Sequence, residues 1–313
     1  MAAKTTAHAC DRVLSLAMQP WAIEREMLGV VASVLAHRLA GDPLDVSALE
    51  KREPVASGAR GGVAIIPIHG VIAPRMNLLS DISGGATYEG LTHDLNEALA
   101  QDDIDTIVFD VDSPGGSALG ATEFARAVRE ARGQKRIVAH ANYMMASAAY
   151  WIGASCDELV AAPSAVVGSV GVYSIHEDLS AQLEQLGVKL TYVSAGKYKV
   201  EGNEAEPLSE SARAHMQSRV DSFYGRFVAD VAKGRGIAAA AVRGGYGEGR
   251  TLLADEALAA GMVDRIATFD ETLAGVLPSH TPALAAANPP APSATSRIAQ
   301  ARAAQRALMA LGF

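Results

Sequence analysis

The sequence predicts an α/β fold in which a mostly parallel sheet is covered by helices. Short continuous apolar runs, typical of buried strands, alternate with amphipathic stretches of helical periodicity along residues 63–268. The chain of 313 residues is 49% hydrophobic but only 5% aromatic, and it holds 29 glycines. That composition suits a sizeable core of aliphatic side chains with many tight corners between strands and helices.

A helical segment is predicted to precede the sheet. Residues 11–39 carry apolar side chains at helical spacing, interrupted near Pro20, which predicts two short helices or one broken helix. We assign residues 1–40 to this N-terminal helical segment. Residues 41–62, which are polar and contain Gly and Pro, are assigned to a linker.

Residues 63–275 form the predicted main domain, in which strands and helices alternate. In sheets of this kind ligands bind at the carboxyl ends of the strands. The predicted strands are 63–72, 104–112, 136–141, 158–163 and 189–196. The predicted helices are 87–101, 120–132, 148–155, 178–187 and 209–236, with a short helix and an edge segment over 253–268.

The last part of the chain differs in composition. From about residue 276 it is rich in Ala, Pro and Ser, which predicts a flexible tail over 276–313. Residues 297–313 have the pattern of a small basic amphipathic helix.

Charge and cysteine content exclude several classes of function. The formal net charge of −8 disfavours nucleic acid and anionic membrane surfaces as partners. Cys10 and Cys156 lie far apart and no metal-ligand motif occurs, so we expect neither a metal nor a cofactor. We see no targeting segment and no run of 18 apolar residues, and we therefore expect a cytoplasmic protein.

The stretch AHANYMMASAAYWIGAS, residues 139–155, places Ser147 at a predicted strand-to-helix corner. A serine at such a corner is most often a helix N-cap, whose hydroxyl accepts a bond from a backbone N–H. The same corner would also raise a nucleophilic hydroxyl above the sheet, beside the N–H of Ala148 and the positive end of a helix. This stretch alone leaves both interpretations open.

A second candidate is DVDSPGGSALG, residues 110–120, where a strand turns into a helix through Ser113, Pro114, Gly115 and Gly116. Paired glycines allow close approach of a substrate and leave N–H groups that can stabilise an oxyanion. An ordinary strand–helix turn would have the same composition.

A serine nucleophile needs a base. Lys197 and Lys199 follow the predicted strand 189–196, and a lysine serves only where burial lowers its pKa from about 10.4 towards neutrality. The two lysines share a face of an extended segment, so their spacing does not choose between them.

Histidine is the rival base. His140 precedes the corner, and His176 with Asp178 or Asp221 would complete a Ser-His-Asp set. A histidine in such a position is more often part of an ordinary loop or helix start.

Four stretches in order, FDVDSPGG, NYMMASAAYWIGAS, GSVGVY and SAGKYKVEGN, resemble the S49 serine peptidase family over roughly residues 62–270. The resemblance implies a ClpP/crotonase-like fold, a β-β-α superhelix. It implies a Ser–Lys dyad, with Ser147 as nucleophile and Lys199 as general base. Gly116 and Ala148 match the positions whose N–H groups form the oxyanion hole. Many relatives have glycine at the position of Ala148, which still supplies an N–H.

Within that family, the helical preface and the segment GKYKVEGN before a long helix are similar to phage capsid maturation proteases. The resemblance implies a prohead protease that trims capsid or scaffold proteins in the host cytoplasm and assembles as a homo-oligomer. Only about 40 residues follow the protease region, too few for the scaffold domain that such chains can carry. The Ala-rich residues 276–300 are a candidate self-cleavage site, and the small residues at the corner indicate a small P1 side chain.

Three other functions stay open on the sequence. One is a cytoplasmic bacterial protease similar to signal peptide peptidase. A second is a crotonase-fold acyl-CoA enzyme, which would hold a thioester enolate with backbone N–H groups and would not need Ser147 paired with Lys199. A third is a non-catalytic assembly factor whose N-terminal helices and residues 297–313 dock to capsid proteins.

Overall fold

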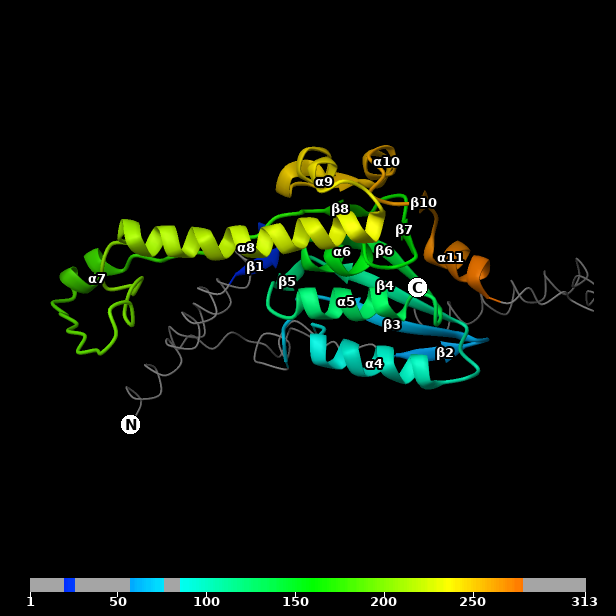
Figure 1. The fold of residues 1–313 in the computed structure, drawn as a ribbon, viewed down its shortest axis with the longest axis horizontal. Helices are drawn as coiled ribbons and strands as arrows, with labels where there is room; N and C mark the ends of the chain where they lie inside the picture. The colour runs from blue at the N-terminus through cyan, green and yellow to red at the C-terminus, as the bar shows by residue number, and fades with distance from the viewer. Residues whose placement is uncertain (1–19, 26–56, 76–84, 278–313) are drawn as a thin grey trace, which may run out of the picture. The chain divides into compact units, whose positions relative to one another are not determined.

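The computed structural model describes residues 20–25, 57–75 and 85–277 (Figure 1). Most of the predicted helical preface, most of the linker, and the tail with its terminal helix lie outside the described residues. Within the described part the chain is a mixed α/β protein with a largely parallel sheet, as the apolar pattern predicts.

The main sheet has the strand order β10-β7-β6-β4-β3-β2, with β8 beside the second half of β6 and β9 beside β8. Neighbours from β10 to β3 run parallel, whereas β2 and β9 pair antiparallel. A separate antiparallel pair joins β1 to β5. The strands are β1 (Trp21–Ile23), β2 (Gly58–Arg60), β3 (Val63–His69), β4 (Thr106–Ser113), β5 (Gly115–Ser117), β6 (Arg136–Ala146), β7 (Glu158–Ala161), β8 (Val166–Gly168), β9 (Thr251–Leu253) and β10 (Arg265–Ile266).

Helices cover both faces of this sheet. Alternate apolar residues of β3, β4 and β6 pack against α4, α5 and α6, and the residues of the opposite phase, such as Val108 and Val138, pack against α11. The helices are α4 (Tyr88–Ala100), α5 (Ala121–Ala131), α6 (Ala148–Gly153), α7 (Ser180–Gln185), α8 (Glu210–Arg235), α9 (Ala239–Gly245), η1 (Gly247–Gly249), α10 (Ala254–Ala259) and α11 (Phe269–Val276).

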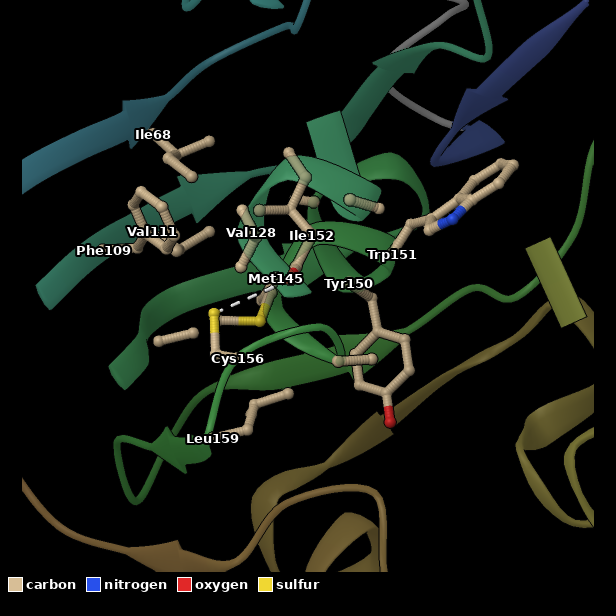
Figure 2. Close-up of a cluster of buried hydrophobic side chains, with 14 of the residues drawn as sticks. Ile68, Phe109, Val111, Val128, Met145, Tyr150, Trp151, Ile152, Cys156 and Leu159 are labelled. Atoms are coloured by element: carbon tan, nitrogen blue, oxygen red, sulfur yellow. Dashed lines mark hydrogen bonds between the residues drawn. The ribbon is translucent and has the colours of Figure 1, made fainter. Parts of the chain in front are cut away.

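The core around α6 is built from large side chains although the chain is poor in aromatics. Figure 2 shows Ile152 of this helix near Val128 of α5 and Met145 of β6, whereas Tyr150 and Trp151 point to other sides of the helix. All three residues of α6 belong to the main hydrophobic core. Every residue of α6 is buried. The helix is therefore held rigidly against the sheet, and so is the corner from which it starts.

An irregularity in β6 determines where that corner lies. Val111 pairs with Ala141, but Ser113 pairs with Met145, so β6 carries extra residues opposite β4. The first half of β6 pairs with β7 and the last three residues, up to Ala146, pair with β8. Such a bulge bends a strand. It allows the end of β6 to change its partner just before residue 147.

The long helix α8 packs on the body only through its carboxyl-terminal half. Phe227 stacks on Trp151 with ring centroids 4.4 Å apart, and Asp230 accepts hydrogen bonds from Trp151 and Arg129. Gly234 allows close contact, because a Cβ there would lie 1.8 Å from the carbonyl oxygen of Ala154. The amino-terminal half extends away from the sheet towards α7 (Figure 1).

Two predicted elements are wrong. Residues 189–196 form no strand; they are exposed, and no neighbouring strand in the described part of this chain satisfies their backbone. Residues 21–23, predicted as part of a helix, form strand β1, because their backbone bonds to distant segments outweigh the local helical pattern. Residues 58–60 of the predicted linker also form a strand, β2.

Candidate active site

Ser147 occupies the corner between β6 and α6 with an unusual backbone. Its φ is 54° and its ψ is −117°, a conformation that costs of order 1–3 kcal/mol for a residue with a side chain. The hydroxyl makes no capping bond to α6; instead Oγ donates a long bond of 3.5 Å to the carbonyl of Gly171. Ser147 does precede α6, but the prediction that its hydroxyl caps the helix is wrong, because that hydroxyl bonds no N–H of α6.

The backbone of Ser147 is held from both sides. Its N–H donates to the carbonyl of Gly168 at 2.7 Å, and its carbonyl accepts from Trp151 at 2.9 Å. Ser147 and Ala148 are both fully buried. These contacts over-determine the corner, which is what allows the strained conformation to persist.

The glycine turn lies directly beside this corner. Ser113 holds the turn, because its Oγ donates to the carbonyl of Gly70 and accepts from the N–H of Gly115. Gly115 has a φ of 96°, and a Cβ placed there would be 2.8 Å from the backbone nitrogen of Ala148. The structure thus brings together the SPGG turn and the Ser147 corner, 32 residues apart in sequence.

Gly116 has no room for any side chain, and this gives a test of the turn. A Cβ at this position would lie 1.9 Å from the carbonyl oxygen of Ile72. We expect Gly116→Ala to lower the free energy of unfolding by about 3 kcal/mol, because the overpacked backbone must shift. Urea unfolding measures this change.

The matched control for that substitution is Gly225→Ala in α8, where a Cβ meets nothing within 4 Å. This variant should gain about 0.5–1 kcal/mol from higher helix propensity. Equal unfolding midpoints for the two variants would contradict the crowding at Gly116.

The two candidate lysines lie elsewhere in the single chain. Lys197 and Lys199 are exposed in the turn before α8, and the Lys197 ammonium lies over the ring of Tyr198. Tyr198 and Glu201 line a hollow with residues 211–219 of α8, whereas Trp151 stacks on Phe227 further along the same helix. At 1.5 Å per residue, Met216 and Phe227 are roughly 16 Å apart along α8. One chain therefore does not bring Lys199 to Ser147.

The two histidines are not joined to Ser147 either. Among the described residues, no hydrogen bond links His176 to Ser147, Asp178 or Asp221, and its Nε2 is buried without a partner. Asp178 instead accepts bonds from Ser180, which hold its pKa below the usual value. His140 lies on the other side of the sheet, where it bonds Thr272 of α11 at 3.0 Å and contacts Phe269.

The buried His140 predicts a pH dependence of stability. Burial lowers the pKa of His140 to about 4, and this outweighs the opposite effect of nearby Asp110. As the pH falls, the unfolded chain binds the proton first, so the neutral ring favours folding above about pH 6.5 and this contribution is lost towards pH 4. We expect His140 to lower the free energy of unfolding by about 3 kcal/mol as the pH falls to about 4, because each pKa unit corresponds to 1.36 kcal/mol.

Urea unfolding between pH 4 and 7 measures this effect. The free energy of unfolding should depend less on pH in His140→Asn than in the unaltered chain, because the asparagine does not titrate and its amide can still bond Thr272. His93→Gln on the exposed side of α4 is the control and should follow the unaltered chain. Parallel curves for all three proteins would contradict the assignment.

Metal and membrane features are limited in the described part of the chain. There, one group of side chains could ligate a metal, namely His93, Asp94 and Glu97 of α4, a helix that carries none of the predicted site residues. No helix of the described residues has the length and apolar character needed to cross a membrane.

Sequence reasoning missed one segment at this site. Strand β1 lies along β5, and Trp21 also pairs with Tyr173, two residues beyond the carbonyl that accepts the bond from Ser147. The sequence signal for this strand was Pro20, followed by three consecutive apolar residues. Proline interrupts a helix and favours extended backbone in the residue before it.

Comparison with known proteins gives a consistent set of similarities. Residues 129–276 match the model of peptidase family S49. The chain is 30% identical over 260 residues to the head-tail preconnector protein GP5 of Enterobacteria phage P21, covering 80% of this chain and 51% of that protein. It is 30% identical over 212 residues to the capsid assembly protease C of Escherichia phage lambda, covering 68% and 48%.

This chain thus spans about half the length of these two phage relatives. A solved structure of a mutant of the 1510-N membrane-bound stomatin-specific protease matches 69% of this chain and 84% of its own, at 15% identity and a TM-score of 0.44.

Proposed function

We propose that this chain belongs to peptidase family S49, whose model matches residues 129–276, and that it is a serine endopeptidase with Ser147 as its nucleophile. The observation that carries the proposal is the corner at Ser147. A hydroxyl that caps no helix sits on a strained backbone, next to the N–H of Ala148 and the Gly115–Gly116 turn. An acyl-transfer site needs this combination of nucleophile and backbone donors.

The proposed reaction is acyl transfer through a Ser–Lys dyad. Neutral Lys199 takes the proton of the Ser147 hydroxyl, Oγ attacks the peptide carbonyl, and the N–H groups of Gly116 and Ala148 stabilise the oxyanion. Protonated Lys199 then gives its proton to the leaving amine. Water hydrolyses the acyl-enzyme, with Lys199 again acting as base, and Ser147 is regenerated.

Because Lys199 lies far from Ser147 in one chain, we propose that the dyad forms between two copies. The segment that carries Lys199 exposes large apolar side chains, including Leu186 at 67%, Val193 at 97% and Tyr198 at 58%. Exposed apolar groups of this size mark interaction surfaces. A homo-oligomer would cover them and would give Lys199 the apolar surroundings that a lysine base needs.

The biological role we propose is the processing of capsid or scaffold proteins during phage head assembly in the bacterial cytoplasm. Its support is that two phage relatives, one named as a capsid assembly protease, match most of this chain. We also propose that the fold is the ClpP/crotonase-like superhelix. In support, a long strand, a short second strand and a helix follow one another in β4, β5 and α5, which is the order that a β-β-α unit requires.

Covalent labelling tests the proposal. The full chain is treated with a fluorophosphonate probe, and intact mass is measured for wild type, Ser147→Ala, Lys199→Ala and Lys197→Ala. We expect a single adduct that is lost in Ser147→Ala and Lys199→Ala but kept in Lys197→Ala. An adduct that persists in folded Ser147→Ala would overturn the nucleophile assignment.

A further inference from the structure

Strand β1 lies in a groove between two segments of the proposed site. On one side Trp21 and Tyr173 exchange backbone bonds, with N···O distances of 2.9 and 3.0 Å. On the other side β1 pairs antiparallel with β5. Two backbone hydrogen bonds flank this pairing with β5. The N–H of Glu24 donates to the carbonyl of Pro114 at 2.7 Å, and the N–H of Ala118 donates to the carbonyl of Pro20 at 3.1 Å. Residues 20–24 are thus held in extended form from both edges, as a bound peptide would be.

The register places Ala22 at the proposed oxyanion hole. Ala22 stands opposite Gly116, midway between the two flanking bonds, at a position where antiparallel partners exchange N–H···O bonds. A Cβ built on Gly115 would be 2.4 Å from the carbonyl oxygen of Ala22 and 2.8 Å from the nitrogen of Ala148. The carbonyl of Ala22 therefore lies beside both proposed donors, where the carbonyl of a scissile bond has to lie.

While β1 is in place, no substrate can occupy this groove. The other edge of β5 is already bonded to Ile72, so β5 has no free edge for a second peptide. Ser147 has no exposed surface at all, and a nucleophile so buried cannot meet a protein chain. Something must therefore leave before cleavage, and β1 is the segment that lies against the donors.

We propose that residues 20–24 are an internal ligand of the substrate groove, which blocks the free chain until a peptide substrate displaces it. The inference rests on the proposed peptidase function and adds a substrate class to it. Trp21, Ala22 and Ile23 are each at most 2% exposed, so the groove already houses an aromatic, a small and a β-branched side chain in that order. Substrates are extended peptides with this pattern, the small residue lying opposite Gly116.

The intramolecular arrangement makes the block effective. A tethered segment competes at an effective concentration of order mM, so a free peptide of equal intrinsic affinity binds only weakly to the intact chain. A variant whose own segment is dislodged should bind the same peptide much more tightly. Ala22→Pro does this, because proline removes the N–H that pairs with Gly116 and disfavours the ladder.

The test uses full-length chains that also carry Ser147→Ala, so that binding is read without cleavage. The probe is a fluorescent peptide with the sequence of residues 18–25, MQPWAIER, followed by anisotropy. We expect Ala22→Pro to bind it at least about ten-fold more tightly than the chain with Ala22 intact. The control is Ala239→Pro, at the first turn of α9 where proline is tolerated; it should bind like the intact chain. A peptide with proline in place of its alanine should not bind.

Two further readouts keep the test decisive. With Ser147 present, Ala22→Pro should react with the fluorophosphonate at least about ten-fold faster than Ala239→Pro, because the tethered competitor is gone. If Ala22→Pro fails to fold, hydrogen exchange on the unaltered chain replaces it, and excess peptide should then accelerate exchange at residues 20–24.

Peptide binding to Ala22→Pro without any fluorophosphonate labelling would support residues 20–24 as the internal ligand but would contradict Ser147 as the nucleophile. Labelling that is unchanged in folded Ala22→Pro, without peptide binding, would overturn the internal ligand and leave the peptidase proposal standing.

Discussion

Replacing Ser147 with alanine should lower the rate of peptide-bond hydrolysis by at least about a thousand-fold, since it removes the hydroxyl that is proposed to attack the carbonyl. The fold should survive this change. Within the described residues, the Ser147 hydroxyl makes one hydrogen bond, the 3.5 Å bond to Gly171, so the free energy of unfolding should change by about 1 kcal/mol or less. Cleavage of a capsid or scaffold substrate, followed by mass spectrometry, measures the first effect, and urea unfolding measures the second.

The control is Ser222→Ala on the exposed face of α8, which removes a hydroxyl of the same kind far from the corner. It should retain the activity of the unaltered chain. Activity that persists in folded Ser147→Ala would move the chemistry to another group and would favour an enzyme that uses the backbone donors alone.

The strand–helix alternation of the main domain could be predicted because it depends on local patterns. Continuous apolar runs correspond to β3, β4, β6 and β7, and amphipathic runs correspond to α4, α5 and α8. The errors arise where distant partners decide the structure. β1 exists because β5 and Tyr173 bond its backbone, and residues 189–196 are no strand because no strand in the described part of this chain pairs with them. The periodicity of apolar residues does not show whether a distant segment pairs with a given stretch of backbone.

The site was predictable in its residue types but not in its geometry. A serine between a strand and a helix indicates a corner, yet the positive φ of Ser147 follows from the bonds to Gly168 and Trp151, which no pattern reveals. Gly116 similarly needs to be glycine because the backbone of Ile72, 44 residues away in sequence, comes too close for a Cβ. Spacing gave the order of these residues and left their distances undetermined.

Lys199→Ala should also abolish hydrolysis, and its combination with Ser147→Ala tests where the dyad forms. Lys199 is exposed near the start of α8, whereas α6 packs at the other end of that helix. If Lys199 serves the Ser147 of a neighbouring copy, chains with either single defect complement each other. In oligomers co-assembled from equal amounts of the two variants, about a quarter of the sites then combine an intact serine with an intact lysine.

The measurement is substrate cleavage by the co-assembled variants, compared with each variant alone and with co-assembled Ser147→Ala and Lys197→Ala. Each inactive variant alone should show no cleavage. The Lys197→Ala mixture should show activity in proportion to its intact serines, because Lys197 is not the base. A dyad within one chain would give no recovery in the Lys199→Ala mixture, since every chain then lacks one partner. Full activity in Lys199→Ala, with loss in His176→Ala, would assign the base to His176, whose Nε2 is buried and has no hydrogen-bond partner among the described residues.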